Sequence, residues 1–184
     1  MKFLGVFQLV LIVVVLASVG VIYRGLFEHR RRKAMIRQVL AETALVSLAD
    51  ITSLSQEAIR LFRDQFGITI RYDDDFELLA NTFDDAVRSR ATVAAFASPQ
   101  FPFYAFLTIG AAIGELLRFR CGGRWAEATE FGPRLTELGT AVGDVHPLHM
   151  ALMHHLKGKP GDLAAEMLRL YSLRSGNSIF GSTA

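Results

Sequence analysis

Cysteine is almost absent from this 184-residue sequence, and the residue patterns of several common enzyme classes are missing. A single cysteine, Cys121, excludes an intrachain disulfide, and there is no C-x-x-C pair that would bind zinc. The sequence also has no H-E-x-x-H, no G-x-S-x-G, no phosphate-binding glycine loop and no dinucleotide fingerprint. Cys121 lies between Arg120 and Gly122 without an identifiable base partner. These absences favour a protein that is not an enzyme and that holds no cofactor.

Charge is missing from one long stretch at the start of the chain. Residues 3–23 contain no charged side chain and are rich in Val, Leu and Ile. At 1.5 Å per residue this length gives roughly 30 Å of helix, which matches the hydrocarbon core of a bilayer. A cleaved signal peptide is the alternative, but the apolar run is longer than a signal's, and Ser18 and Gly20 make a poor cleavage site. We therefore predict that residues 1–23 form a single transmembrane anchor.

Basic residues gather directly after this stretch and predict its orientation. Residues 1–37 hold seven Lys and Arg and one acid, and six of the seven follow the apolar run. Positive charge is retained on the cytoplasmic side, so we expect the bacterial inner membrane, with the N-terminus outside and the domain in the cytoplasm. The juxtamembrane segment 24–37 can have two roles. It sets this topology, and it attracts anionic headgroups of the membrane. The residues expected at the membrane surface are Arg24, Arg30, Arg31, Arg32 and Lys33.

The rest of the chain has an excess of acid. The whole chain has 20 basic and 18 acidic residues, and removing those of residues 1–37 leaves 13 and 17, a net charge of −4. A domain that binds DNA or RNA carries the opposite balance on its surface. Nucleic acid is therefore excluded as the expected partner.

Apolar periodicity predicts a mainly α (α+β) domain over residues 38–174. Asp73–Asp75 form a capping signal and lack the alternating ligands of a calcium loop. Glycine and proline punctuation predicts a few short antiparallel strands within 124–142, and residues 68–72 suit a short strand or an extended linker. The tail 175–184 has the composition of a disordered end. We expect helices over 33–49, from a cap at Ser53 or Ser55 to Gly67, over 76–87, over 147–157 and over 162–171.

A second uncharged stretch, residues 91–114, raises the question of another membrane span. Pro99 and Pro102 interrupt it, and the continuous apolar part that follows is too short to cross a bilayer. A crossing would also place the arginines that follow on the wrong side. We predict a buried core helix that starts at Pro102, which suits the first helical position.

Three short patterns follow one another in the second half of the domain. A G-x-x-x-G-E pattern contains Gly110, Gly114 and Glu115, and a G-G-R-W turn spans residues 122–125. With Pro147 before a Leu/Met/Lys helix and a Tyr-Asp-Asp-Asp segment upstream, the chain resembles, over about residues 57–172, a bacterial family of domains of unknown function. The resemblance implies a compact α+β domain with a few short strands and carries no known activity.

These patterns also predict specific contacts. The small residues Gly110 and Gly114 let another element approach the helix backbone closely, or in a membrane would favour helix dimerisation, and we expect packing. We expect Trp125 to pack on this ridge and Glu115 to pair with Arg124 as a structural salt bridge. The structural residues named by this pattern are Gly110, Gly114, Glu115, Gly123, Arg124 and Trp125.

Four of the five histidines lie within ten residues. His146 and His149 stand at i and i+3 of the expected helix and share a face, so both could reach one metal ion. Further ligands are missing from the sequence around them, and His154 and His155 point to other faces. We therefore expect polar residues on an amphipathic helix and treat His146 and His149 as weak metal candidates only.

Together these features predict a non-catalytic accessory subunit. It would dock on, or stabilise, a larger inner-membrane complex of photosynthetic or respiratory type, with other membrane-protein subunits as partners. A membrane-tethered regulatory or ligand-binding module is the alternative, and an enzyme that uses Glu115, Arg124 and the histidines is a third. A flat apolar patch favours the first reading, and a polar pocket where those residues converge favours the third.

Overall fold

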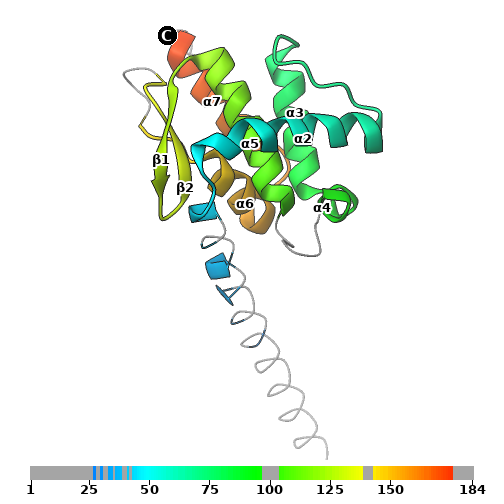
Figure 1. Ribbon diagram of the computed structural model, residues 1–184. Helices are drawn as coiled ribbons and strands as arrows, with labels where there is room; N and C mark the ends of the chain where they lie inside the picture. The colour runs from blue at the N-terminus through cyan, green and yellow to red at the C-terminus, as the bar shows by residue number, and fades with distance from the viewer. Residues whose placement is uncertain are drawn as a thin grey trace, which may run out of the picture. The chain divides into compact units, whose positions relative to one another are not determined.

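The computed structural model describes residues 43–96, 104–138 and 143–175, together with isolated positions before residue 43. Contacts divide the chain into two compact units, residues 1–39 and 40–184. The described part of the second unit is mainly helical with one two-stranded antiparallel hairpin, so the predicted fold class is correct at this level. Its elements (Figure 1) are α2 (Leu48–Phe66), α3 (Phe76–Arg88), α4 (Arg90–Phe96), α5 (Tyr104–Cys121), β1 (Arg124–Thr129), β2 (Gly132–Thr136), α6 (Pro147–Lys157) and α7 (Asp162–Ser175).

The predicted membrane anchor lies outside the described residues, as do Arg24, Arg31, Arg32 and the tail after residue 175. Arg30 and Lys33 are described, and both are helical and exposed. Within the described residues, no helix is at once long enough and apolar enough to cross a membrane.

Helix α5 forms the centre of the domain (Figure 1), and α2 and α6 pack against it. Its first eleven residues carry no charge, and almost all of them are buried. A helix that is apolar on every side is stable only when neighbours cover it all round. The predicted core helix is therefore confirmed, although its expected first residue, Pro102, lies outside the described residues.

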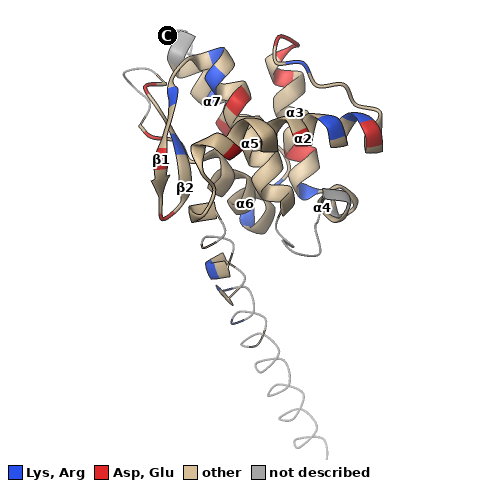
Figure 2. Ribbon diagram, viewed as in Figure 1, with Lys and Arg blue, Asp and Glu red and all other residues tan. Residues whose placement is uncertain are grey.

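Two groups of buried side chains surround α5. The larger joins α2, α3, α5, α6 and α7, and it includes an edge-to-face contact between Phe62 and Phe83 and a stacked pair of Phe76 and Tyr171. The smaller lies between α2, α5 and α6 and consists of Val46, Ile51, Leu54, Leu107, Ala111 and Leu148. Charged residues of both signs are interspersed over α2 and the hairpin (Figure 2). Exposed ion pairs of this kind contribute little, about 0–1 kcal/mol each, so apolar burial holds the fold.

The start of α2 differs from the prediction. A helix was expected to run to Ala49 and the next to begin at Ser53 or Ser55, but the chain turns at Leu45 and α2 begins at Leu48. The cap is Ser47, whose backbone N–H and hydroxyl both donate to the Asp50 carboxylate, at 3.1 and 2.6 Å. Because this local pair satisfies groups left free at a helix start, it fixes the boundary several residues earlier.

The segment between α2 and α3 is an extended linker and not a strand. Gly67 ends α2 as predicted, in the left-handed conformation (φ 66°), and residues 68–71 have no ladder partner. Asp75 then caps α3, since its Oδ1 accepts from the Leu78 N–H at 2.8 Å, which confirms the predicted use of the acidic run. The short helix α4 was not predicted.

The hairpin follows α5 through a tight glycine turn. Trp125 pairs with Leu135 across the strands, and Leu135 also forms an antiparallel bridge with Val145. Gly123 has φ 89°, and an added Cβ would lie 2.6 Å from the Thr136 carbonyl oxygen, so only glycine fits there. The predicted short strands are confirmed for β1 and β2.

The last two helices agree largely with the prediction. Helix α6 runs from Pro147 to Lys157 with Gly158 after it, as expected. Asp162, however, is the first residue of α7 and accepts from the Lys159 N–H at 2.7 Å. The N-terminus of α7 is instead bound by the buried Asp84 of α3, which accepts from the N–H groups of Gly161 (3.0 Å) and Leu163 (2.9 Å). The helix continues to Ser175, past the predicted end.

Candidate functional site

The glycine–glutamate pattern on α5 builds a structural junction with the hairpin. The Trp125 Nε1–H donates to Glu115 Oε1 at 2.6 Å, and Arg118 binds the same carboxylate at 2.8 and 3.1 Å. The predicted Glu115–Arg124 pair is wrong, because Arg124 pairs with Glu137 at 2.8 Å. Successive residues of a strand face opposite ways, so Trp125 and Arg124 cannot both face α5, whereas Arg118 lies one turn from Glu115 on the same helix.

The predicted small-residue ridge is shared between two neighbours. Trp125 packs on Gly114, where an added Cβ would lie 2.3 Å from its ring. Gly110 instead meets the backbone of α6, where an added Cβ would lie 2.6 Å from the Leu148 Cα. Both glycines therefore serve close packing inside the domain as predicted, and Trp125 packs on the Gly114 part of the ridge. Since Glu115 already binds two donors, this junction serves architecture.

The histidines of α6 are distributed over several contacts. His146 and His149 lie against the Phe131 ring, with ring centroids 5.5 and 4.9 Å away. Burial lowers the pKa of His149. His155 Nδ1 lies 2.6 Å from the Val87 carbonyl oxygen, to which it must donate. In the part of the chain that the structure describes, no three His, Cys, Asp or Glu side chains are grouped to hold a metal ion.

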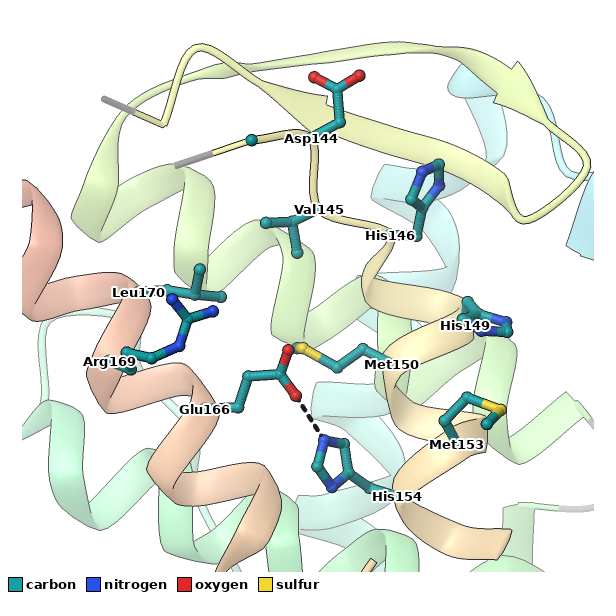
Figure 3. Close-up of a pocket in the computed structure, with 11 residues that line it drawn as sticks. Asp144, Val145, His146, His149, Met150, Met153, His154, Glu166, Arg169 and Leu170 are labelled. Atoms are coloured by element: carbon teal, nitrogen blue, oxygen red, sulfur yellow. Dashed lines mark hydrogen bonds and ion pairs between the residues drawn. The ribbon is translucent and has the colours of Figure 1, made fainter. Parts of the chain in front are cut away.

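A pocket of about 320 Å³ opens between α6, α7 and the segment that leads into α6 (Figure 3). We call it the α6–α7 pocket. Val145, Met150 and Leu170 supply apolar walls, and Glu166 and Arg169 extend from α7 (Figure 3). Its lining residues are Gly143, Asp144, Val145, His146, His149, Met150, Met153, His154, Glu166, Arg169 and Leu170.

Some polar groups of this pocket have hydrogen-bond or ion-pair partners among the described residues, and others have none. His154 Nε2 lies 2.6 Å from Glu166 Oε2, and its Nδ1 is buried without a hydrogen-bond partner among the described residues. A buried N–H without an acceptor is rarer than a buried acceptor without a donor, so we place the proton on Nε2, which donates to Glu166. Asp144 pairs with Arg134. Arg169 has neither a hydrogen bond nor an ion pair with any described residue.

A second, apolar hollow of about 460 Å³ lies between the start of α2 and the start of α5. We call it the α2–α5 groove. Leu45 lines the groove and is 83% exposed. On α5, the Tyr104 hydroxyl donates to Glu57 at 2.9 Å, and burial raises the pKa of this phenol to about 12. The residues that line the groove are Leu45, Val46, Asp50, Ser53, Leu54, Tyr104 and Leu107.

Comparisons with known proteins find no match: no family model, no curated protein and no solved structure is similar to this chain. The resemblance of residues 57–172 to a bacterial family of unknown function therefore stays a prediction.

Sequence reasoning missed both hollows. Glu166 and Arg169 had no signal of their own, because a single acid and a single base one turn apart are ordinary on an exposed helix. The apolar pair Leu45 and Val46, directly before a serine cap, is a signal that could have identified the edge of the groove. Glu115 and Arg124, which the enzyme reading would combine with the histidines, do not line the α6–α7 pocket.

Proposed function

We propose that this chain is a membrane-tethered docking subunit without catalytic activity. In this proposal residues 3–23 cross the bacterial inner membrane with the N-terminus outside. The domain of residues 38–174 binds another membrane-protein subunit from the cytoplasmic side through the α2–α5 groove. The observation that carries the proposal is the apolar groove lined by the exposed Leu45, close to the start of the domain.

The exposed Leu45 gives the groove a driving force for association. Burying a leucine side chain completely is worth about 1.5–3 kcal/mol, so covering the 83% of Leu45 that is exposed contributes about 2 kcal/mol. This is a modest free energy for two proteins that meet in solution, since association costs more than this in lost freedom.

Tethering changes that balance. Only 21 residues lie between Tyr23, the end of the predicted span, and Leu45, so the groove lies within roughly 75 Å of the bilayer even for a fully extended chain. A partner in the same membrane is thereby held at high effective concentration, and a weak contact becomes sufficient. The partner that fits is a membrane protein that presents an apolar helix or loop at its cytoplasmic surface.

The absence of catalysis in this proposal is supported by how the reactive groups are used. The Glu115 carboxylate is occupied by Trp125 and Arg118, and the Cys121 side chain is buried in the core. His154 faces Glu166, and no nucleophilic hydroxyl or thiol is among the residues that line that pocket.

Site-specific photo-crosslinking in intact cells tests the docking surface. A photo-reactive residue at position 45 should link the full chain to an integral membrane protein, whereas the same residue at Leu78, 62% exposed on α3, should not. The substitution Ser53→Lys, which places a charge in the groove, should abolish the link from position 45, and Thr52→Lys, outside the groove, should leave it intact. Both sites are exposed positions inside α2, so the effect on folding is matched.

Equal crosslinking from positions 45 and 78, or a link that survives Ser53→Lys, contradicts docking through the groove. Circular dichroism of both variants checks that the fold is retained.

A further inference from the structure

We propose that the α6–α7 pocket binds a free aliphatic α-amino acid, with Arg169 receiving its carboxylate and Glu166 its ammonium group. The proposal concerns a different surface from the α2–α5 groove and does not depend on docking. It gives the tethered domain a small ligand, which the proposed docking function does not require.

The charges of the pocket leave two groups available. Asp144 is neutralised by Arg134, and His154 occupies only one oxygen of Glu166, Oε2. Glu166 Oε1 and the Arg169 guanidinium have no partner among the described residues. The Glu166 side chain is 38% exposed and Arg169 is also exposed, so both are accessible to a ligand.

The spacing of these two groups suits a zwitterion. Glu166 and Arg169 are three residues apart on α7 and therefore lie on the same side of the helix, one turn from each other, without forming an ion pair. An α-amino acid carries its ammonium and carboxylate groups on the same carbon atom, so one charged group can face Glu166 and the other Arg169. An isolated anion would be attracted by Arg169 and repelled by Glu166, and an isolated cation would be attracted by Glu166 and repelled by Arg169.

The walls define the rest of the ligand. Val145, Met150 and Leu170 line the pocket beside the charged pair (Figure 3), which favours a branched aliphatic side chain. Methionine adapts its shape to such a group. The pocket volume of about 320 Å³ is sufficient for an amino acid of this size.

A contact with His154 holds the Glu166 side chain in place. The His154 Nε2 lies 2.6 Å from Oε2, and the His154 side chain is only 16% exposed. This contact orients the carboxylate through Oε2 and leaves Oε1 available to a ligand. His154 is a positioning residue for Glu166 and not a ligand contact in this scheme.

Calorimetric titration of the full chain in lipid nanodiscs tests the proposal, with empty nanodiscs as the blank. L-leucine should bind with a dissociation constant of roughly 0.01–1 mM, the range expected for about nine non-hydrogen atoms. 4-Methylpentanoate, which lacks the ammonium group, and 3-methylbutylamine, which lacks the carboxylate, should each bind at least ten-fold more weakly. Loss of one charge-assisted contact accounts for roughly that factor.

Two conservative variants locate the site. Arg169→Gln and Glu166→Gln should each weaken leucine binding roughly ten-fold or more, and Arg63→Gln, which changes an exposed arginine on α2, should leave it unchanged. Glutamine at position 166 still accepts from His154, so the fold is retained, and an unchanged melting curve verifies this.

No saturable heat with L-leucine, or equal binding by Arg169→Gln and Arg63→Gln, overturns the proposal. Equal binding of 4-methylpentanoate overturns the role of Glu166 and with it the amino-acid class. None of these results bears on the crosslink from position 45, so the two proposals fail separately.

Discussion

Replacing Gly110 by alanine tests the packing of α5 against α6. The added Cβ would lie 2.6 Å from the Leu148 Cα and 3.0 Å from the Pro147 carbonyl oxygen. Both are backbone atoms at the start of α6, so no side chain can rotate away. The two helices must separate by close to 1 Å to restore an ordinary carbon–carbon distance of about 3.5–4.0 Å.

The magnitude follows from two opposing effects. Alanine in place of glycine favours the helix by about 1 kcal/mol, whereas overpacking a well-packed core costs about 1–3 kcal/mol and often more when backbone must move. Separation also loosens Ala111 and Leu148, which are completely buried in the smaller core group. We expect Gly110→Ala to lower the free energy of unfolding by about 1–2 kcal/mol.

Denaturant unfolding of the full chain in detergent measures this change. Trp125 on β1 is the only tryptophan of the sequence, and its ring lies against Gly114, which is on the same helix as Gly110. Its fluorescence therefore reports on the packing around α5. Gly143→Ala is the matched control, because nothing lies within 4 Å of the Cβ it would add, and its effect should stay within about 0.5 kcal/mol. A Gly110→Ala protein as stable as the original, or more stable, would refute the close approach of α5 and α6.

Two further predictions concern buried polar groups. Burial raises the pKa of both Tyr72 and Tyr104 to about 12. The folded state therefore favours the neutral phenol of each tyrosine. This preference stabilises the fold fully below about pH 10, and the stabilisation is lost as the pH rises towards 12. Ultraviolet titration should show two late-ionising tyrosines and only one after Tyr72→Phe, and early ionisation of both would contradict their burial. Asp84→Asn should destabilise the fold by about 2–3 kcal/mol, because an amide cannot accept from both N–H groups at the start of α7 as the buried carboxylate does. The matched change Asp85→Asn, on the exposed face of α3, should have little effect in the same unfolding assay, and equal effects of the two would contradict the capping role.

The sequence predicted elements whose boundary signals are local. Pro147 at the first position of α6 and Gly158 after its last residue fix that helix, and both bounds were correct. The start of α2 was missed because several serines were available as caps. Ser47 is the one with an acid three residues later, and this pair decides the boundary.

Contacts between distant elements were not predictable in the same way. The Glu115–Arg124 pair was predicted because the two residues belong to successive short patterns of the sequence. The direction of each side chain on β1, however, depends on how the hairpin docks on α5. His154 and Glu166 meet because α7 packs beside α6, and the Asp84 carboxylate helps to position α7 by binding its start. No sequence period encodes such an arrangement, which is why both candidate sites came from the structure.

Membrane topology is the measurement that tests the central claim most directly. The full chain should remain in the membrane pellet after alkaline carbonate extraction, and deletion of residues 3–23 should release it. A C-terminal fusion to a fluorescent protein that folds only in the cytoplasm should be bright, and a fusion to a phosphatase that is active only in the periplasm should be inactive. Release of the full chain by carbonate, or an active phosphatase fusion, would contradict a domain held at the cytoplasmic face of the membrane.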